Sequence, residues 1–290
     1  MIKLLTQAWR SLFVDTYYAA EAEAAAARLA AAQAEDAQVP PPDRETIVVL
    51  ITAALALTFQ NYVSAQGGYL AFTRFLEGLG LTTAAAHLNS LYRAPETAEL
   101  ARLTFWVTCC VTSYVLIPVT ALTIFVRRPL RDYGLRIAGM AGHLWIYGAM
   151  FLLMVPAVIA VSFTASFQNK YPFYDLRPGE SLWPYFASWE LMYALQFVAL
   201  EFFFRGFLVH GTRRRLGYYS VLVMTIPYTM IHFQKPALET LGAVAAGVAL
   251  GTLSLKTRSI WWGAGLHISV AYTMDTAALW QRGFFAVEGP

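Results

Sequence analysis

The sequence has few charged residues, few cysteines and long stretches that carry no charge at all. Only 13% of its 290 residues are charged, while 58% are hydrophobic. Soluble domains carry about 25% charged residues, so this deficit excludes an ordinary soluble domain and indicates an integral membrane protein. The formal net charge of +3 is small, so we expect membrane lipid, and no nucleic acid, among the partners.

The two cysteines, Cys109 and Cys110, are adjacent and lie in an apolar run. Adjacent cysteines rarely bridge, and neither has another partner, so we expect packing residues and no disulfide. The first residues also lack the continuous apolar core of a signal peptide, because Gln7, Arg10 and Asp15 interrupt it. We therefore expect no cleaved signal segment.

Seven apolar runs approach the length of about 20 residues that a bilayer requires. They are predicted at 46–65, 103–126, 139–163, 185–210, 219–232, 238–255 and 260–280. The fifth is short and contains Pro227, as expected of a tilted or partly re-entrant segment. The predicted fold class is all-α: a polytopic helical membrane protein with about seven transmembrane helices and an N-terminal cytoplasmic or interfacial helix.

Three regions follow from this pattern. Residues 1–42 are predicted as an N-terminal extension, with an amphipathic start, an Ala-rich solvated helix and a proline linker. Residues 43–137 hold the first spans and a mixed loop with a short amphipathic helix. Residues 138–290 form the core, whose polar motifs fall between residues 200 and 275.

Basic residues in short loops predict the orientation in the membrane. Such residues follow the second, fourth and sixth spans: Arg127, Arg128, Arg131, Arg136, Arg213, Arg214, Arg215, Lys256 and Arg258. Basic loops remain in the cytoplasm, so we expect a cytoplasmic N-terminus. The same pattern suits a bacterial inner membrane.

Ionisable groups inside the later spans are the candidate functional residues, because lipid makes them costly. Glu201 and Arg205 are four residues apart, so a helix places them on one face. A buried ion pair that only fixes helix packing is the structural alternative. His232 and His267 lie in two other spans, and Asp275 follows His267 by two helical turns.

A carboxylate with two imidazoles supports two chemistries. In the first, Glu201 takes a proton from water while His232 and His267 orient the water or stabilise an oxyanion. In the second, the same three side chains bind a divalent metal such as zinc, which activates the water. The spacing on separate helices favours neither chemistry.

These motifs resemble a known family in their order and spacing. They are Glu201-x-x-x-Arg205-Gly206, Tyr228-x-x-x-His232, the small pair Gly247 and Gly251, Thr257-Arg258-Ser259-Ile260-Trp261 and Gly263-x-x-x-His267. Together they are similar to the CAAX protease and bacteriocin-processing family of intramembrane proteases. The resemblance covers about residues 180–280, and more weakly 128–180. It implies a helical membrane enzyme in which a Glu and a His activate water to cleave peptide bonds.

The chain departs from the family pattern at three positions. The family's general base is usually a Glu at the position of Leu200, and its oxyanion Asn stands where this chain has Ala271. Tyr228 replaces a usual Phe. Either Glu201 acts as the base, or other groups such as Asp275 or Tyr228 compensate, or the site is inactive.

The predicted function is an intramembrane endopeptidase that cleaves a membrane-anchored peptide or protein, such as a prenylated C-terminus, a leader or a sorting segment. Glu201, His232 and His267 are the predicted catalytic residues, supported by Arg205, Tyr228 and Asp275. The alternative is an inactive family member that acts as a membrane binding, chaperone or immunity protein. A transporter is disfavoured because the halves of the chain show no inverted repeat.

Overall fold

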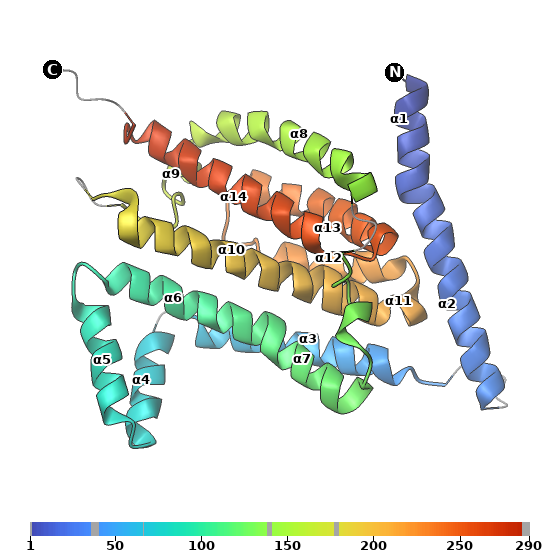
Figure 1. Ribbon diagram of the computed structural model, residues 1–290, viewed down its shortest axis with the longest axis horizontal. Helices are drawn as coiled ribbons and strands as arrows, with labels where there is room; N and C mark the ends of the chain where they lie inside the picture. The colour runs from blue at the N-terminus through green and yellow to red at the C-terminus, as the bar shows by residue number, and fades with distance from the viewer. Residues whose placement is uncertain (1, 36–40, 66, 138–140, 177–179, 286–290) are drawn as a thin grey trace. The chain divides into compact units, whose positions relative to one another are not determined.

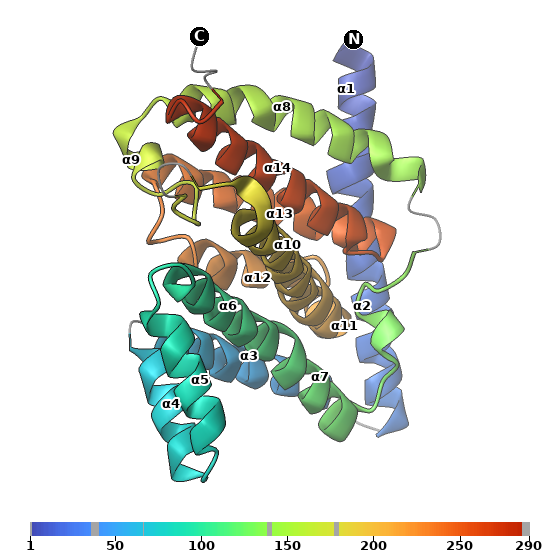
Figure 2. The same cartoon turned by 60° about the vertical axis from the view of Figure 1, so that its left-hand side comes forward.

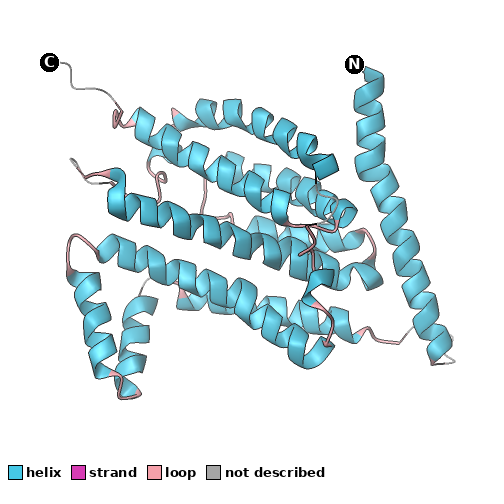
Figure 3. Cartoon of the chain, in the orientation of Figure 1, coloured by secondary structure: helices cyan, strands magenta, loops and turns pink. Residues whose placement is uncertain are grey.

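The computed structural model describes residues 2–35, 41–65, 67–137, 141–176 and 180–285. In these ranges the regular structure is helical (Figure 3), apart from one isolated antiparallel bridge between Leu135 and Ser259. The prediction of an all-α fold is therefore confirmed.

Five helical stretches are long and apolar enough to cross a membrane. They are Arg44–Val63, Ala98–Val126, Leu144–Ser162, Leu182–Leu216 and Ala237–Thr257, which match the predicted first, second, third, fourth and sixth spans. The other two predicted spans are helical but do not reach that combination of length and apolarity. They are α12 (Tyr219–Met230), with 12 residues, and α14 (Trp261–Gln281), with 21. The protein is a polytopic helical membrane protein.

The chain divides into two compact units. The first comprises residues 1–54, 116–147 and 200–264, and the second comprises residues 55–115, 148–199 and 265–290. The first unit contains α1 (Ile2–Trp9), η1 (Arg10–Val14), α2 (Asp15–Ala34), the start of α3 (Arg44–Val63), α7 (Ile117–Ala121), η3 (Leu122–Val126), η4 (Leu130–Asp132), η5 (Ala141–His143), η7 (Phe202–His210), α11 (Gly211–Leu216), α12 and α13 (Ala237–Thr257). In Figures 1 and 2, α2 runs beside α11 in both views.

The N-terminal helices are held against the rest of the first unit and are not simply solvated, which corrects the expectation of a solvated extension. The Glu21 carboxylate accepts the backbone N–H of Tyr218 at 2.9 Å. The Arg28 guanidinium donates to the carbonyl of Arg215 at 3.0 Å, and Lys256 donates to the carbonyl of Ser11 at 2.6 Å. Polar contacts of this kind can attach a helix that has no wide apolar face, such as the Ala-rich α2.

The segment η7 is wound as a π-helix and is buried along all nine of its residues. Gly206 lets the carbonyl of Tyr133 approach, since a Cβ there would lie 2.7 Å from that oxygen. The Tyr133 hydroxyl in turn donates to Glu45 at 2.6 Å, and burial raises the pKa of this phenol, so it remains a donor. π-Helical turns are rare and occur frequently at functional sites.

The second unit contains the remaining helices. They are the end of α3, α4 (Gly68–Gly78), α5 (Thr82–Arg93), α6 (Ala98–Val111), η2 (Thr112–Leu116) except its last residue, most of α8 (Leu144–Ser162), α9 (Ala165–Gln168), η6 (Leu182–Phe186), most of α10 (Ala187–Glu201) and most of α14. Where one short amphipathic helix was predicted between the first two spans, the structure has two, α4 and α5, which lie side by side in Figure 2. Its core is rich in aromatic residues, including Trp189 and Tyr193, whose rings stack at 4.7 Å.

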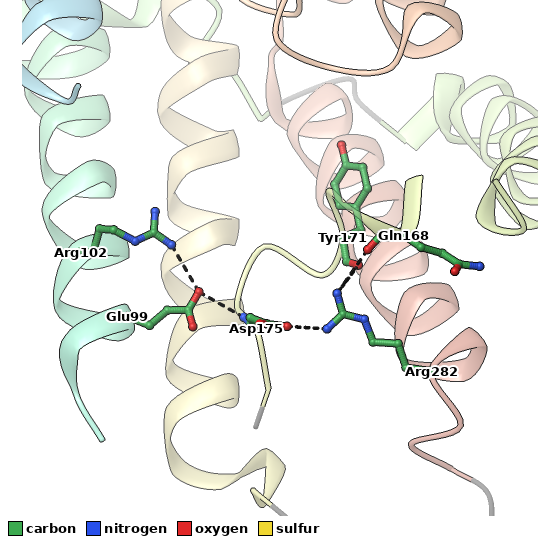
Figure 4. A network of polar contacts seen from close by, with 6 residues as sticks. All are labelled: Glu99, Arg102, Gln168, Tyr171, Asp175 and Arg282. Atoms are coloured by element: carbon green, nitrogen blue, oxygen red, sulfur yellow. Dashed lines mark hydrogen bonds and ion pairs between the residues drawn. The ribbon is translucent and has the colours of Figure 1, made fainter. Parts of the chain in front are cut away.

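A polar network ties three elements of the second unit together (Figure 4). Arg282 contacts Asp175 at 2.5 Å and also donates to the carbonyl of Tyr171 at 3.1 Å. The backbone N–H of Asp175 donates to Glu99 at 3.2 Å, and Glu99 also contacts Arg102 at 3.3 Å. The network joins the start of α6, the 171–175 loop and the residue after α14.

Candidate active site at the end of α10

The centre of the candidate site is the ion pair at the junction of α10 and η7. Arg205 Nη1 lies 3.0 Å from Glu201 Oε1, and the two side chains are 0% and 1% exposed. The prediction that these two groups share one face is confirmed. Removing either partner would leave an uncompensated charge in a low-dielectric interior.

The first turn of α14 lies against the carboxylate of Glu201. A Cβ built on Gly263 would be only 2.6 Å from Glu201 Oε2, so only a glycine leaves room for this carboxylate. The position is the positive end of a long helix, which stabilises a negative charge. Tyr147 of α8 is buried and also interacts electrostatically with Glu201 and Arg205.

Arg205 links the ion pair to the second motif. Its guanidinium carbon lies 4.0 Å from the centroid of the Tyr228 ring, the geometry of a cation–π contact. The Tyr228 and His232 rings are 4.9 Å apart and inclined at 61°. Glu201, Arg205, Tyr228 and His232 therefore form a continuous chain of contacts within the first unit.

The geometry of His232 assigns its tautomer. Nδ1 lies 2.8 Å from the carbonyl oxygen of Tyr228. A carbonyl oxygen only accepts hydrogen bonds, so Nδ1 must carry the proton. In the neutral ring Nε2 then holds the lone pair, as a base or a metal ligand requires.

The other predicted residues lie in the second unit. His267 stacks on Phe197 of α10, with centroids 5.5 Å apart and planes inclined at 15°. Asp275, fully buried, interacts with Glu190 of α10. The Tyr272 hydroxyl donates to the carbonyl of Glu190 at 2.8 Å. The structure therefore shows Asp275 beside a second carboxyl group, two turns from His267 along α14.

Leu200 and Ala271, two of the three positions that depart from the family pattern, are buried and apolar. Leu200 is 5% exposed, and Ala271 is part of the aromatic cluster of the second unit with Tyr193. Gln196, one turn before Leu200, is 4% exposed, and its Oε1 has no hydrogen-bond partner among the described residues. None of these three side chains supplies a base.

The part of the chain that the structure describes offers no group of side chains that could bind a metal ion. No three His, Cys, Asp or Glu side chains there are grouped so that they could hold a metal ion. The ion pair with Arg205 also engages the carboxylate that such a site would need. The described residues therefore do not fit a divalent metal ion.

Comparison with known proteins agrees with this geometry. Residues 182–273 match the model of a family described as type II CAAX prenyl endopeptidase Rce1-like. The match supports a member of the CAAX protease and bacteriocin-processing family. No curated protein and no solved structure matches the chain.

The match confirms the resemblance drawn from the motifs and supports CAAX-type intramembrane proteolysis in general. The match begins in η6, includes all of α10 to α13 and ends within α14. Everything before residue 182 lies outside it. Glu190, Tyr147 and the steric role of Gly263 were missed from sequence, because each depends on a contact between helices that are far apart along the chain.

Proposed function

We propose that this protein is an intramembrane endopeptidase whose substrate is a membrane-tethered, CAAX-type peptide. The observation that carries the proposal is the contact chain from Glu201 through Arg205 and Tyr228 to His232, which lies inside the segment that matches the protease family.

In this proposal His232 is the base. Its Nε2 takes a proton from water, and the resulting hydroxide attacks the carbonyl carbon of the scissile peptide bond. The carbon–nitrogen bond then breaks, and the proton moves from His232 to the leaving amine. His267 stabilises the oxyanion, a role that comes from the family resemblance.

Glu201 acts as a positioning residue in this scheme. A carboxylate that is 1% exposed and paired with a guanidinium is a weak proton acceptor. It holds Arg205, which holds the Tyr228 ring, and the carbonyl of Tyr228 orients His232. In this scheme the ion pair positions the base, and the base is His232 because Leu200 cannot accept a proton.

The test is cleavage of a membrane-anchored reporter with a prenylated CAAX terminus by the purified full chain in detergent or liposomes. We expect His232→Gln to lose activity by about 100-fold or more, the usual scale for a general base. Glu201→Gln should lose less activity than His232→Gln, because Glu201 acts on the base only through Arg205 and Tyr228. A folded Glu201→Gln variant as inactive as His232→Gln would make Glu201 the base, and full activity of His232→Gln would end the proposal.

A second candidate function rests on Leu200 and Ala271. Because both positions are buried and apolar, the chain would then be an inactive member that binds membrane-tethered peptides without cutting them. In that case the unmodified chain binds the reporter without cleaving it. The double variant Leu200→Glu with Ala271→Asn then creates activity that the parent lacks.

We also propose an orientation of the protein in the membrane. We place the N-terminus and the basic ends of the even-numbered spans in the cytoplasm of a bacterial cell, with the protein in the inner membrane. Cysteine labelling of the basic loops from either side of sealed vesicles tests this orientation.

A further inference from the structure

An arginine-lined cavity lies in the first unit, and the proposed peptidase chemistry does not use it. The cavity has a volume of about 220 Å³ and is lined by Glu23, Arg131, Asp132, Arg136, Arg213 and Arg258. Four guanidinium groups face two carboxylates, so the lining carries an excess positive charge. A volume of this size has room for one tetrahedral anion and several waters.

One carboxylate inside the cavity already occupies the position of an anion. Glu23 of α2 contacts Arg213 at 3.0 Å and also pairs with Arg258. Arg213 Nε and Arg258 Nη1 are nevertheless buried and have no hydrogen-bond partner among the described residues. The other lining carboxylate, Asp132, lies 3.7 Å from Arg136, beyond hydrogen-bond distance. The cavity therefore has donor capacity that its own carboxylates do not satisfy.

The backbone at Arg258 allows the side chain to be removed without disturbing the end of α13. Arg258 ends α13 in the left-handed conformation, with φ of 55°, which a residue with a Cβ adopts at a cost and glycine adopts readily. Arg127 ends η3 in the same conformation, with φ of 60°, but does not line the cavity.

The four arginines of the cavity all lie at or near the end of an apolar span. Arg213 lies in the last turn of α11, Arg258 directly follows α13, and Arg131 and Arg136 follow η3. Each therefore lies at or just beyond the end of an apolar span, where a lipid phosphate lies. Basic cavities between helices on the cytoplasmic side are typical binding sites for anionic head groups.

We propose that this cavity binds a phosphate group, with Arg213 and Arg258 as the principal ligands, and that Glu23 of the N-terminal helix competes with it for the same guanidinium groups. Arginine suits this ligand because its planar fork matches phosphate oxygens. Binding would displace Glu23 and so weaken the attachment of α2 to the rest of the first unit.

The test measures binding to the purified full chain with two probes: inorganic phosphate, and vesicles of phosphatidylcholine with or without phosphatidic acid. We expect Arg258→Gly to weaken binding about tenfold, the loss of one charge-assisted contact. Glycine suits the left-handed backbone, so this variant keeps the end of α13 intact. Arg127→Gly is the matched control, because it removes the same charge from the same backbone conformation and should leave binding unchanged.

Glu23→Gln gives the opposite sign. It removes the competing carboxylate, so phosphate should bind several-fold more tightly, while a merely structural ion pair would predict no gain. Binding of phosphatidic acid but not of inorganic phosphate identifies a lipid head group, and binding of inorganic phosphate alone identifies a soluble anion. The proposal is overturned if the unmodified chain binds neither probe, if Arg127→Gly weakens binding as much as Arg258→Gly, or if Glu23→Gln binds no better.

Discussion

Glu201 in the first unit and Asp275 in the second are both fully buried carboxyl groups, but they have opposite kinds of partner. Glu201 pairs with Arg205 at 3.0 Å and lies at the positive end of α14. Asp275 lies beside Glu190, another carboxyl group. Two carboxyl groups in such contact are stable only when they share a proton, because two negative charges would repel. The first unit thus balances a buried charge with a cation, while the second places two buried carboxyl groups beside each other.

The largest expected effect comes from breaking the ion pair of the first unit. Arg205→Met should lower the free energy of unfolding by about 3–5 kcal/mol, because it leaves Glu201 buried without a counter-charge. Denaturant titration in detergent measures the loss. The double variant with Glu201→Met is the control and should recover most of the loss. A single variant as stable as the parent would show that the pair carries no structural role.

A smaller loss should follow from crowding the carboxylate of Glu201. Gly263→Ala places a Cβ 2.6 Å from Glu201 Oε2, so the carboxylate must move, which costs about 1–3 kcal/mol. The matched control is Gly265→Ala in the same helix. A Cβ at Gly265 meets no described atom within 4 Å, and alanine there should raise helix stability by about 0.5–1 kcal/mol. Thermal unfolding of the two variants should shift in opposite directions.

The carboxyl pair of the second unit should tolerate the loss of one acid. Asp275→Asn replaces one carboxyl of the pair with an amide of the same shape, which removes a potential charge and can still donate to Glu190, so the free energy of unfolding should change by less than about 1 kcal/mol. The same measurement on Glu201→Gln provides the contrast, since it leaves Arg205 without a counter-charge. Equal losses in the two variants would remove the distinction between the units.

The smallest effect is expected at the rim of the carboxyl pair. Tyr272→Phe removes only the hydroxyl that donates to the carbonyl of Glu190. Tyr272 is 36% exposed, so water can replace the bond, and the loss should be about 0.5 kcal/mol. A loss as large as that of Gly263→Ala would show that this hydroxyl also supports the buried carboxyl pair.

Local spacing explains which features could be predicted from the sequence. Glu201 and Arg205 are one helical turn apart, as are Tyr228 and His232, so their contacts need no knowledge of the tertiary fold. The long apolar spans follow from composition in the same way. These local rules account for the all-α fold and for the half of the candidate site that lies in the first unit.

Contacts between distant helices could not be predicted in this way. Glu190 becomes significant only through the register of α10 against α14, and nothing in a single sequence specifies that register. The Ala-rich helix α2 was expected to be solvated because it has no wide apolar face, yet Glu21 and Glu23 attach it through polar contacts. The partners of these glutamates, such as Tyr218 and Arg213, lie almost 200 residues away along the chain.

Arg127 and Arg258 have a consequence for the biosynthesis of the protein. Each ends an apolar helix in a left-handed conformation for which glycine is the usual residue. A glycine would relax the backbone by about 1–2 kcal/mol, but it would also remove a positive charge from a loop next to an apolar span, and basic residues in such loops favour the cytoplasmic side during insertion. At these two positions a relaxed backbone and a basic loop favour different residues, and the sequence has the residue that carries the charge.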